Sequence, residues 1–154
     1  MSQIGSEVGQ VAPSFQLRDA KGESFSLEAQ RGRPVVLLFY PGDDTPVCTK
    51  QLCSVRNNWS RYQTYGAEVV GINTDSEEAH KKFIQNHQLP LRLLVDGDGS
   101  VVKAYGMRSL LGVKRGVVVI DEAGIVRYRK TVVPIFRPDE EEVFEVLESL
   151  KKAR

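Results

Sequence analysis

Histidine, tryptophan and cysteine are scarce in this chain: two, one and two residues in 154. Because a structural zinc site needs four nitrogen or sulfur ligands, zinc is disfavoured. His80 and His87 lie on one expected helix, about 10.5 Å apart along its axis, and we interpret both as solvated helix residues. Neither histidine stands in a companion motif, which also disfavours a cysteine–histidine hydrolase.

The sequence also lacks a charge excess and a long apolar run. Its 21 basic residues nearly balance 20 acidic ones, whereas nucleic-acid binders usually carry a basic face, so no nucleic-acid partner is expected. No apolar run approaches the roughly 20 residues that span a bilayer, and residues 1–15 show no signal-peptide pattern. We therefore expect a cytoplasmic location and no membrane partner. In the cytosol a close cysteine pair more often has redox or metal-binding work than a structural disulfide.

The chain shows no repeats, no low-complexity segment and no dividing linker, so residues 1–154 are expected to form one domain. Apolar runs and turn residues predict an N-terminal hairpin turning at 21–22, buried strands at 35–40, 68–73 and 91–96, a strand hairpin over 116–130, helices at 46–64, 76–87 and from 139, and a helical turn at 101–105. Strands that alternate with helices and end in an antiparallel hairpin indicate one α/β layered domain.

Both cysteines lie in "FYPGDDTPVCTKQLC", residues 39–53. Thr45 is a plausible helix N-cap and Pro46 a good first helical residue, which puts Cys48 in the first turn. Free backbone N–H groups and the helix dipole favour an anion there, so the Cys48 thiol should ionise more readily than a free thiol. If Thr45 caps, its hydroxyl lies within one turn of the sulfur. The polar "GDDT" before it indicates a surface loop.

Cys53 follows five positions after Cys48. In a regular helix the two side chains are about 140° apart with roughly 7.5 Å of rise between them. Their Cα atoms are then more than about 7 Å apart, too far for a disulfide without backbone movement. Either the cysteines never bond or the helix unwinds each time they do. Alternatively, Cys53 is a small buried core residue.

The cysteine segment resembles the active-site stretch of peroxiredoxins, whose signature Pro-x-x-x-Thr-x-x-Cys is matched here by Pro41, Thr45 and Cys48. A second cysteine five residues later resembles the bacterioferritin-comigratory (PrxQ) branch. The segments "VGQVAPSFQLRDAKGESFSL", "VVGINTDS" and "VKRGVVVID" extend the resemblance over nearly the whole chain. It implies an α/β, thioredoxin-like fold: a central mixed β-sheet flanked by helices, with an N-terminal hairpin extension.

The resemblance implies a thiol-dependent peroxidase that reduces hydrogen peroxide and organic hydroperoxides. Cys48 matches the peroxidatic cysteine, and Cys53 matches the resolving cysteine that would form an intrachain disulfide. Pro41 would shield the site and Thr45 would bind the peroxide. Thioredoxin is the implied reductant, with glutaredoxin as the alternative. No cofactor or metal is implied, and the branch is often monomeric, so a monomer is expected rather than a dimer.

An arginine suits this chemistry because it stays charged and aims fixed donors at developing negative charge. The family's second-site arginine maps onto Arg115, but Gly-Val-Val follows where relatives usually have Ser or Thr and then Thr-Phe, so Arg108 and Lys114 remain rivals. Gln51 matches a position where the family has Glu or Gln, and Gln51 and Tyr40 are expected to support the substrate pocket.

Two other functions remain open. One is a thiol–disulfide oxidoreductase acting on protein disulfides, although the chain has no C-x-x-C motif. The other is a non-enzymatic redox sensor that uses the helix switch to control a partner. The Pro-x-x-x-Thr spacing favours a peroxidase, because a protein-disulfide reductase has no need for a hydroxyl that orients peroxide.

Overall fold

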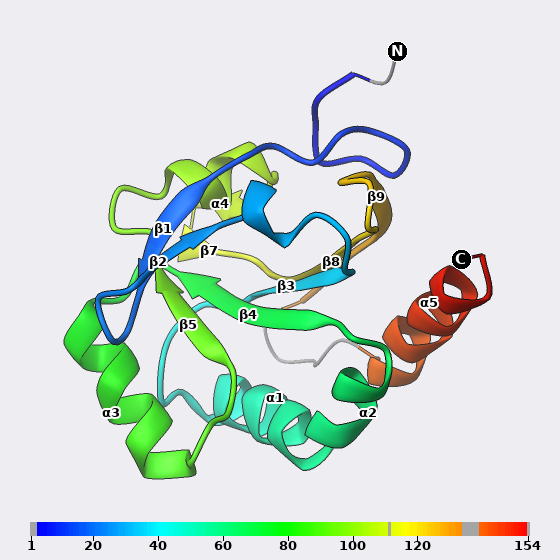
Figure 1. Cartoon of the computed structure of the whole chain (residues 1–154). Coiled ribbons are helices and arrows are strands. Elements are labelled where there is room, and N and C mark those ends of the chain that lie inside the picture. The colour runs from blue at the N-terminus through cyan, green and yellow to red at the C-terminus, as the bar shows by residue number, and fades with distance from the viewer. Residues whose placement is uncertain (1–2, 111, 134–138, 154) are drawn as a thin grey trace.

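The computed structural model describes residues 3–110, 112–133 and 139–153 (Figure 1). Seven strands form one mixed sheet in the order β2-β1-β5-β4-β3-β8-β9. These strands are β1 (Gln16–Asp19), β2 (Ser24–Ser26), β3 (Val35–Phe39), β4 (Glu68–Asn73), β5 (Arg92–Val95), β8 (Arg115–Ile120) and β9 (Val126–Val132). Two-residue strands β6 (Arg108–Ser109) and β7 (Gly112–Val113) pair separately. The helices are η1 (Glu28–Gln30), α1 (Pro46–Asn57), α2 (Trp59–Thr64), α3 (Glu77–His87), α4 (Ser100–Ala104) and α5 (Glu140–Lys152).

The centre of the sheet is built from the strands with unbroken apolar runs. Every residue of β3 and of β8 is buried, as expected of strands covered on both faces. β3 runs parallel to β4 and antiparallel to β8, and β1 joins the far side of β5 antiparallel. The mixed thioredoxin-like sheet and the N-terminal β1–β2 hairpin confirm the predicted fold class.

Each face of the sheet carries its own core. Alternate β3 side chains point to opposite faces: Val35, Leu37 and Phe39 join one buried cluster, and Val36 and Leu38 join the other. The first cluster packs against α4, and the second packs against α1, α2, α3 and α5. Figure 1 shows these four helices along one side of the sheet and α4 on the other. The segment with both cysteines therefore lies in the four-helix layer.

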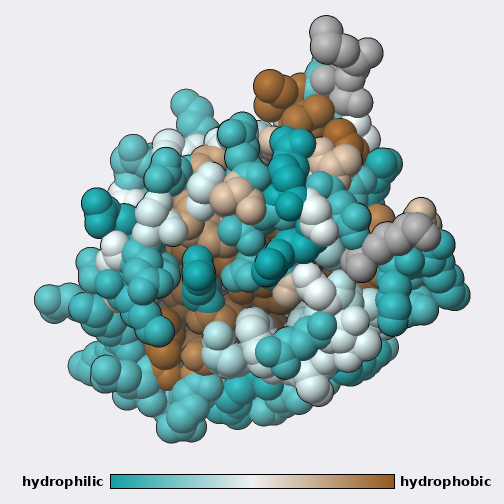
Figure 2. Space-filling model, in the orientation of Figure 1, coloured by the Kyte–Doolittle hydropathy of each residue, from teal (hydrophilic) through white to brown (hydrophobic). Residues whose placement is uncertain are grey.

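The outer surface is largely polar. Figure 2 shows a mostly hydrophilic face with hydrophobic residues near the N-terminal segment, where Ile4 and Val8 are exposed, and between the hydrophilic residues lower on the same face. Every helix in the described ranges is too short or too polar to traverse a bilayer.

The expected helix over residues 46–64 is wrong in one respect, because it breaks at Asn58. There the backbone leaves helical geometry (φ −105°, ψ 16°), so α1 ends and α2 begins one residue later. The Asn58 side-chain amide donates to the Ser54 carbonyl at 3.2 Å. Asparagine side chains commonly compete in this way with helical backbone bonds.

The other expected elements are confirmed with small shifts of their ends. β4 matches residues 68–73, and the hydroxyl of Ser76 caps α3 by accepting from Ala79 N at 3.1 Å. Asp139 caps α5 by accepting from Glu141 N at 3.0 Å. The position of α5 matters for the site, because its first turn packs beside the α1–α2 break.

Candidate active site

The loop between β3 and α1 sets the amino end of the candidate site. Thr45 occupies the predicted N-cap position with extended backbone (φ −82°, ψ 151°), and Pro46 follows in the first turn. The predicted capping bond is wrong: the Thr45 hydroxyl donates instead to the Gly42 carbonyl at 3.0 Å, and no side-chain cap joins it to α1 in the part of the chain described. The N–H groups of the first turn therefore remain open to a bound oxygen or anion.

Cys48 lies in the first turn of α1 but is fully buried, with 0% of its surface exposed. The sequence indicated a surface loop at this point, and that inference holds for Asp44 and Thr45 but not for the cysteine. The reason is the inward face of α1: Cys48 shares a buried cluster with Tyr40 and Leu52. A reactant must therefore pass the side chains that cover the sulfur, which favours a small one.

Arg115 is the cation that contacts this sulfur. Its Nη2 donates to Cys48 Sγ at 3.0 Å and its Nη1 donates to Gln51 Oε1 at 2.5 Å. The β3–β8 register pairs Phe39 with Gly116, which puts Arg115 beside the chain leaving β3. Only 2% of Arg115 is exposed, so solvent screens its charge weakly.

The two rival cations lie elsewhere. Arg108 in β6 and Lys114 are both exposed. Neighbouring residues of an extended chain point to opposite sides, so Lys114 faces outward where Arg115 faces the sulfur. Only the tertiary pairing of β3 with β8 distinguishes these candidates.

Gln51 lies one turn after Cys48 on the same face of α1, as side chains three residues apart do. It is 5% exposed, and its carbonyl oxygen accepts the Arg115 bond. Its amide Nε2 is buried without a hydrogen-bond partner among the described residues. A buried unpaired donor costs free energy, so this N–H is available to an oxygen that reaches the Cys48 sulfur.

Pro41 is half-buried and borders the opening of the site. It lines a surface groove of about 770 Å³ together with Arg115 and Lys114. The remaining wall is mainly apolar and consists of Ser109, Leu110, Val113, Thr131, Val132 and Val133. The catalytic candidates therefore adjoin a groove with apolar walls and two cations at one side.

Tyr40 stabilises the loop between β3 and α1 with a hydrogen bond. Its hydroxyl donates to Asp43 Oδ1 at 2.7 Å, and Asp43 N donates to Asp75 Oδ2 at 2.7 Å. Burial, followed by the nearby Asp43 carboxylate, raises the pKa of Tyr40 well above its usual value. Tyr40 is thus a neutral donor that holds the loop through Asp43.

His80 lies beside the loop that precedes α1. The sequence predicted a solvated residue there, but His80 is fully buried. Its Nδ1 lies 2.5 Å from Asp43 Oδ2, and its Nε2 lies 2.9 Å from the Leu94 carbonyl. A carbonyl can only accept, so Nε2 carries a hydrogen. The available signal was the spacing of His80 from Phe83, three residues on along the inward face of α3. His87, by contrast, is half-exposed and pairs with Asp44 at 2.8 Å.

Cys53 is half-buried, and both cysteines are free thiols. α1 is continuous from Pro46 to Asn57, so the geometry of an i, i+5 pair applies and the sulfurs point to different sides of the helix. In this state the helix keeps the two cysteines apart. Within the described residues no group of three or more histidine, cysteine, aspartate or glutamate side chains could hold a metal ion.

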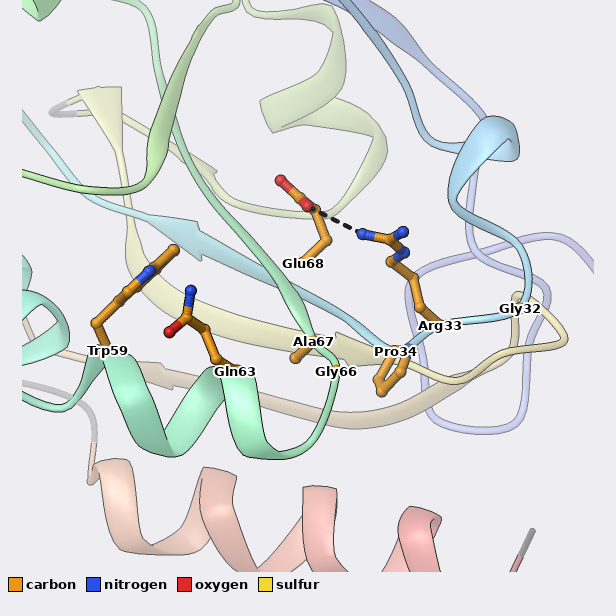
Figure 3. A pocket seen from close by; sticks show the side chains of 8 residues that line it. All are labelled: Gly32, Arg33, Pro34, Trp59, Gln63, Gly66, Ala67 and Glu68. Carbon is orange, nitrogen blue, oxygen red and sulfur yellow. Dashed lines mark hydrogen bonds and ion pairs between the residues drawn. The ribbon is translucent and has the colours of Figure 1, made fainter.

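A second hollow of about 480 Å³ lies at the opposite end of the sheet, where β3 and β4 begin (Figure 3). It is lined by Gly32, Arg33, Pro34, Trp59, Gln63, Gly66, Ala67 and Glu68. Its charged groups, Arg33 and Glu68, pair with each other at 3.5 Å. The buried thiol and arginine at the amino end of α1 are therefore the better candidate for chemistry.

Comparisons with known proteins identify the family of the chain. Residues 8–129 match the model of the AhpC/TSA family. The chain is 44% identical over 123 residues to chloroplastic peroxiredoxin Q of Triticum aestivum, covering 78% of this chain and 57% of the relative. It is 41% identical over 150 residues to chloroplastic peroxiredoxin Q of Sedum lineare, covering 93% of this chain and 78% of the relative. The chain is 42% identical over 128 residues to a protein of Coxiella burnetii named as peroxiredoxin Bcp, covering 78% of this chain and 85% of that protein.

Solved structures give the same result. Peroxidoxin BcpB of Mycobacterium tuberculosis superposes with a TM-score of 0.83 at 32% identity, over 94% of this chain and 97% of that one. Peroxiredoxin Q of Xanthomonas campestris superposes with a TM-score of 0.83 at 23% identity, over 89% and 91% of the two chains, and supports the fold. The sequence and structural matches together show that this chain belongs to the AhpC/TSA family, as a thiol peroxidase of the PrxQ/Bcp branch of peroxiredoxins.

Proposed function

We propose that the chain reduces hydrogen peroxide and organic hydroperoxides with Cys48 as the attacking thiolate. The observation that carries this proposal is the buried Arg115 guanidinium, which donates to the buried Cys48 Sγ at 3.0 Å. The thiolate attacks the hydroperoxide oxygen that bears hydrogen, and the O–O bond breaks. Sulfur keeps that oxygen as a sulfenic acid, and the other oxygen leaves as hydroxide or alkoxide and takes up a proton.

Each neighbouring residue has a role in this step. Arg115 stabilises negative charge on the sulfur and then on the departing oxygen, typically the largest contribution in such sites. Thr45 orients the peroxide with its hydroxyl, and Pro41 limits the access of water. Gln51 orients Arg115 by accepting its Nη1 bond, while its free amide N–H faces an incoming oxygen. Tyr40 supports the pocket through its bond to Asp43 in the preceding loop.

Cys53 then resolves the sulfenic acid. Its thiol condenses with Cys48–SOH, which forms an intrachain disulfide and releases water. Because α1 keeps the two cysteines apart, residues near 45–55 unwind before this step. The i, i+5 spacing within one regular helix supports this order of events.

An external dithiol returns the disulfide to two thiols. Thioredoxin is the proposed reductant and glutaredoxin the alternative, with the protein acting as a cytoplasmic monomer without cofactor or metal. The disulfide reductase and redox-sensor alternatives gain no observation that favours them, since the buried cysteine suits a small substrate better than a protein disulfide.

A peroxidase assay coupled to a thioredoxin system tests the whole proposal. Wild type should oxidise one reductant dithiol, which supplies two electrons, for each hydrogen peroxide consumed, and Cys48→Ser should consume neither. Replacing thioredoxin with glutaredoxin in the same assay identifies the reductant. Reduction of protein disulfides without peroxide consumption would instead support the oxidoreductase.

A further inference from the structure

Glu140, the first residue of α5, holds the carboxyl end of α1. Its half-buried carboxylate accepts hydrogen bonds from Ser54 Oγ, from Asn58 Nδ2 at 3.3 Å and from Tyr62 OH at 2.6 Å. These donors come from α1, from the break and from α2. One carboxylate near the end of the chain thus joins three points around the α1–α2 break, and Figure 1 shows the start of α5 beside it.

The three donors suit an ionised carboxylate, which only accepts hydrogen bonds. Burial, followed by the charge of Glu140, raises the pKa of Tyr62 far above its usual value, so Tyr62 remains a donor. Bonds to an ionised group are roughly twice as strong as neutral ones. Among the hydrogen bonds of the described residues, the bond from Ser54 to Glu140 is the one that joins α1 directly to α5.

The adjacent Glu141 makes a different contact. Its carboxylate pairs with Arg61 of α2 through bonds of 2.8 and 3.3 Å, and the Arg61 guanidinium lies 3.9 Å from the centre of the Phe144 ring. Glu141 thus holds α5 to α2, whereas Glu140 also holds α5 to α1. Because Glu140 and Glu141 are adjacent in α5 but contact different residues, substitutions of the two can be compared directly.

Oxidation of Cys48 changes the hold at only one end of α1. At the amino end, Arg115 donates to the sulfur itself, and a neutral sulfenic acid accepts this bond more weakly than a thiolate. At the carboxyl end, the bonds to Glu140 involve no sulfur. Ser54 directly follows Cys53, so moving Cys53 toward Cys48 pulls the Ser54 hydroxyl away from Glu140.

We propose that Glu140 is a positioning residue that limits how fast Cys53 reaches oxidised Cys48. By keeping the last turns of α1 folded, it lengthens the lifetime of the sulfenic acid without affecting its formation. This inference rests on the proposed resolving role of Cys53. Cys48–SOH and Cys53–SH still give one disulfide and one water, and Glu140 changes only the rate.

The test follows the reduced full-length chain after one equivalent of hydrogen peroxide, with acid quenching and intact-mass analysis over time. Gain of one oxygen reports the sulfenic acid, and net loss of two hydrogens reports the disulfide. We expect Glu140→Ala to form the disulfide about tenfold faster than wild type, because a hydrogen bond to a charged group is lost. Ser54→Ala should act in the same direction, and the double variant should be no faster than Glu140→Ala alone.

The matched control is Glu141→Ala, which should leave the rate of disulfide formation unchanged. The rate of sulfenic acid formation should be equal in all these variants. Unchanged disulfide rates in both Glu140→Ala and Ser54→Ala, or equal acceleration by Glu141→Ala, would overturn the inference. Failure of the proposed function is distinct, because wild type itself would then keep the added oxygen and never lose two hydrogens.

Discussion

The two ends of α1 are held in different ways. At the amino end Cys48 is fully buried, and Arg115 reaches it from the central sheet. At the carboxyl end Cys53 is half-buried, and the last turns of α1 bond to other helices. The Ser54 hydroxyl donates to the Glu140 carboxylate, and Arg56 Nη1 donates to the His87 backbone carbonyl at 2.6 Å. The amino end is therefore pre-organised around the sulfur, while the carboxyl end depends on polar contacts that can break and re-form.

In the proposed mechanism this difference suits separate tasks for the two halves of one helix. Fixed donors at the reacting atom favour chemistry because they need no reorganisation. The resolving cysteine instead needs a segment that can open, and we expect the polar contacts of Ser54 and Arg56 with other helices to set how fast it opens. The apolar residues Leu52 and Val55 pack the inward face of the second half of α1, so we expect the proposed opening to remain local.

The largest expected effect separates the two cysteines. Cys48→Ser should abolish peroxide consumption, because serine is not ionised at neutral pH. Cys53→Ser should consume one equivalent of peroxide at the wild-type rate and then stop in the absence of another thiol, leaving a persistent sulfenic acid. Stopped-flow peroxide consumption and intact mass check both results. Equal loss of the first turnover in the two variants would remove the contrast between the ends.

The second-largest expected effect tests the contact of Arg115 with Cys48 at the amino end of α1. Arg115→Ala should slow peroxide attack about 10²- to 10³-fold, the usual cost of removing one fixed donor at a developing charge. Lys114→Ala is the neighbouring control and should change the rate less than about threefold, as an exposed charge does. The second-order rate constant with hydrogen peroxide measures both, with circular dichroism to show intact folds. A large loss in Lys114→Ala alone would move the assignment to that residue.

The two histidines give a matched test of stability near the amino end. His80→Ala should destabilise the fold by about 3 kcal/mol, because it removes the imidazole from Asp43 Oδ2 and leaves that buried carboxylate with neutral donors at Oδ1 only. His87→Ala should cost less than about 1 kcal/mol, since its contact with Asp44 is partly exposed. Urea unfolding of reduced protein measures both. Similar losses in the two variants would show that burial of His80 has no special importance for the loop.

The smallest effect concerns alkaline pH and compares Tyr40 with Tyr62. Burial is the main cause that raises the pKa of both tyrosines above the ordinary value of 10.0. The folded state thus binds these protons more tightly than the unfolded state, so their contribution to stability is complete below pH 10 and falls as pH rises above it. The pKa of Tyr128 is raised to about 12, mainly by burial.

Melting temperatures from pH 8 to 11 and tyrosinate absorbance measure this effect. Stability should fall above pH 10, and tyrosinate should form together with unfolding. Tyr40→Phe and Tyr62→Phe should each lessen the alkaline loss. Ordinary titration of all five tyrosines near pH 10 in the folded protein would contradict the expectation.

The sequence alone predicted where α1 begins and where the central strands lie. The Thr-Pro pair at 45–46 located the start of α1, and the apolar runs located β3, β4 and β8. These features depend on residues within a few positions of one another, because caps, turns and apolar periodicity are local. The Arg115 assignment came from the family resemblance, and the sequence left Arg108 and Lys114 as rivals.

Tertiary structure alone decided the rest. No local signal indicated the partner of the Thr45 hydroxyl or the break at Asn58, and the burial of His80 had only its spacing from Phe83 as a signal. Ser54 and Glu140 lie 86 positions apart, and Arg115 and Cys48 lie 67 apart. Contacts over such distances depend on strand register and on which helix faces meet, and no local pattern encodes either. Local sequence patterns therefore determined where α1 begins, and the packing of distant segments determined which contacts hold each of its ends.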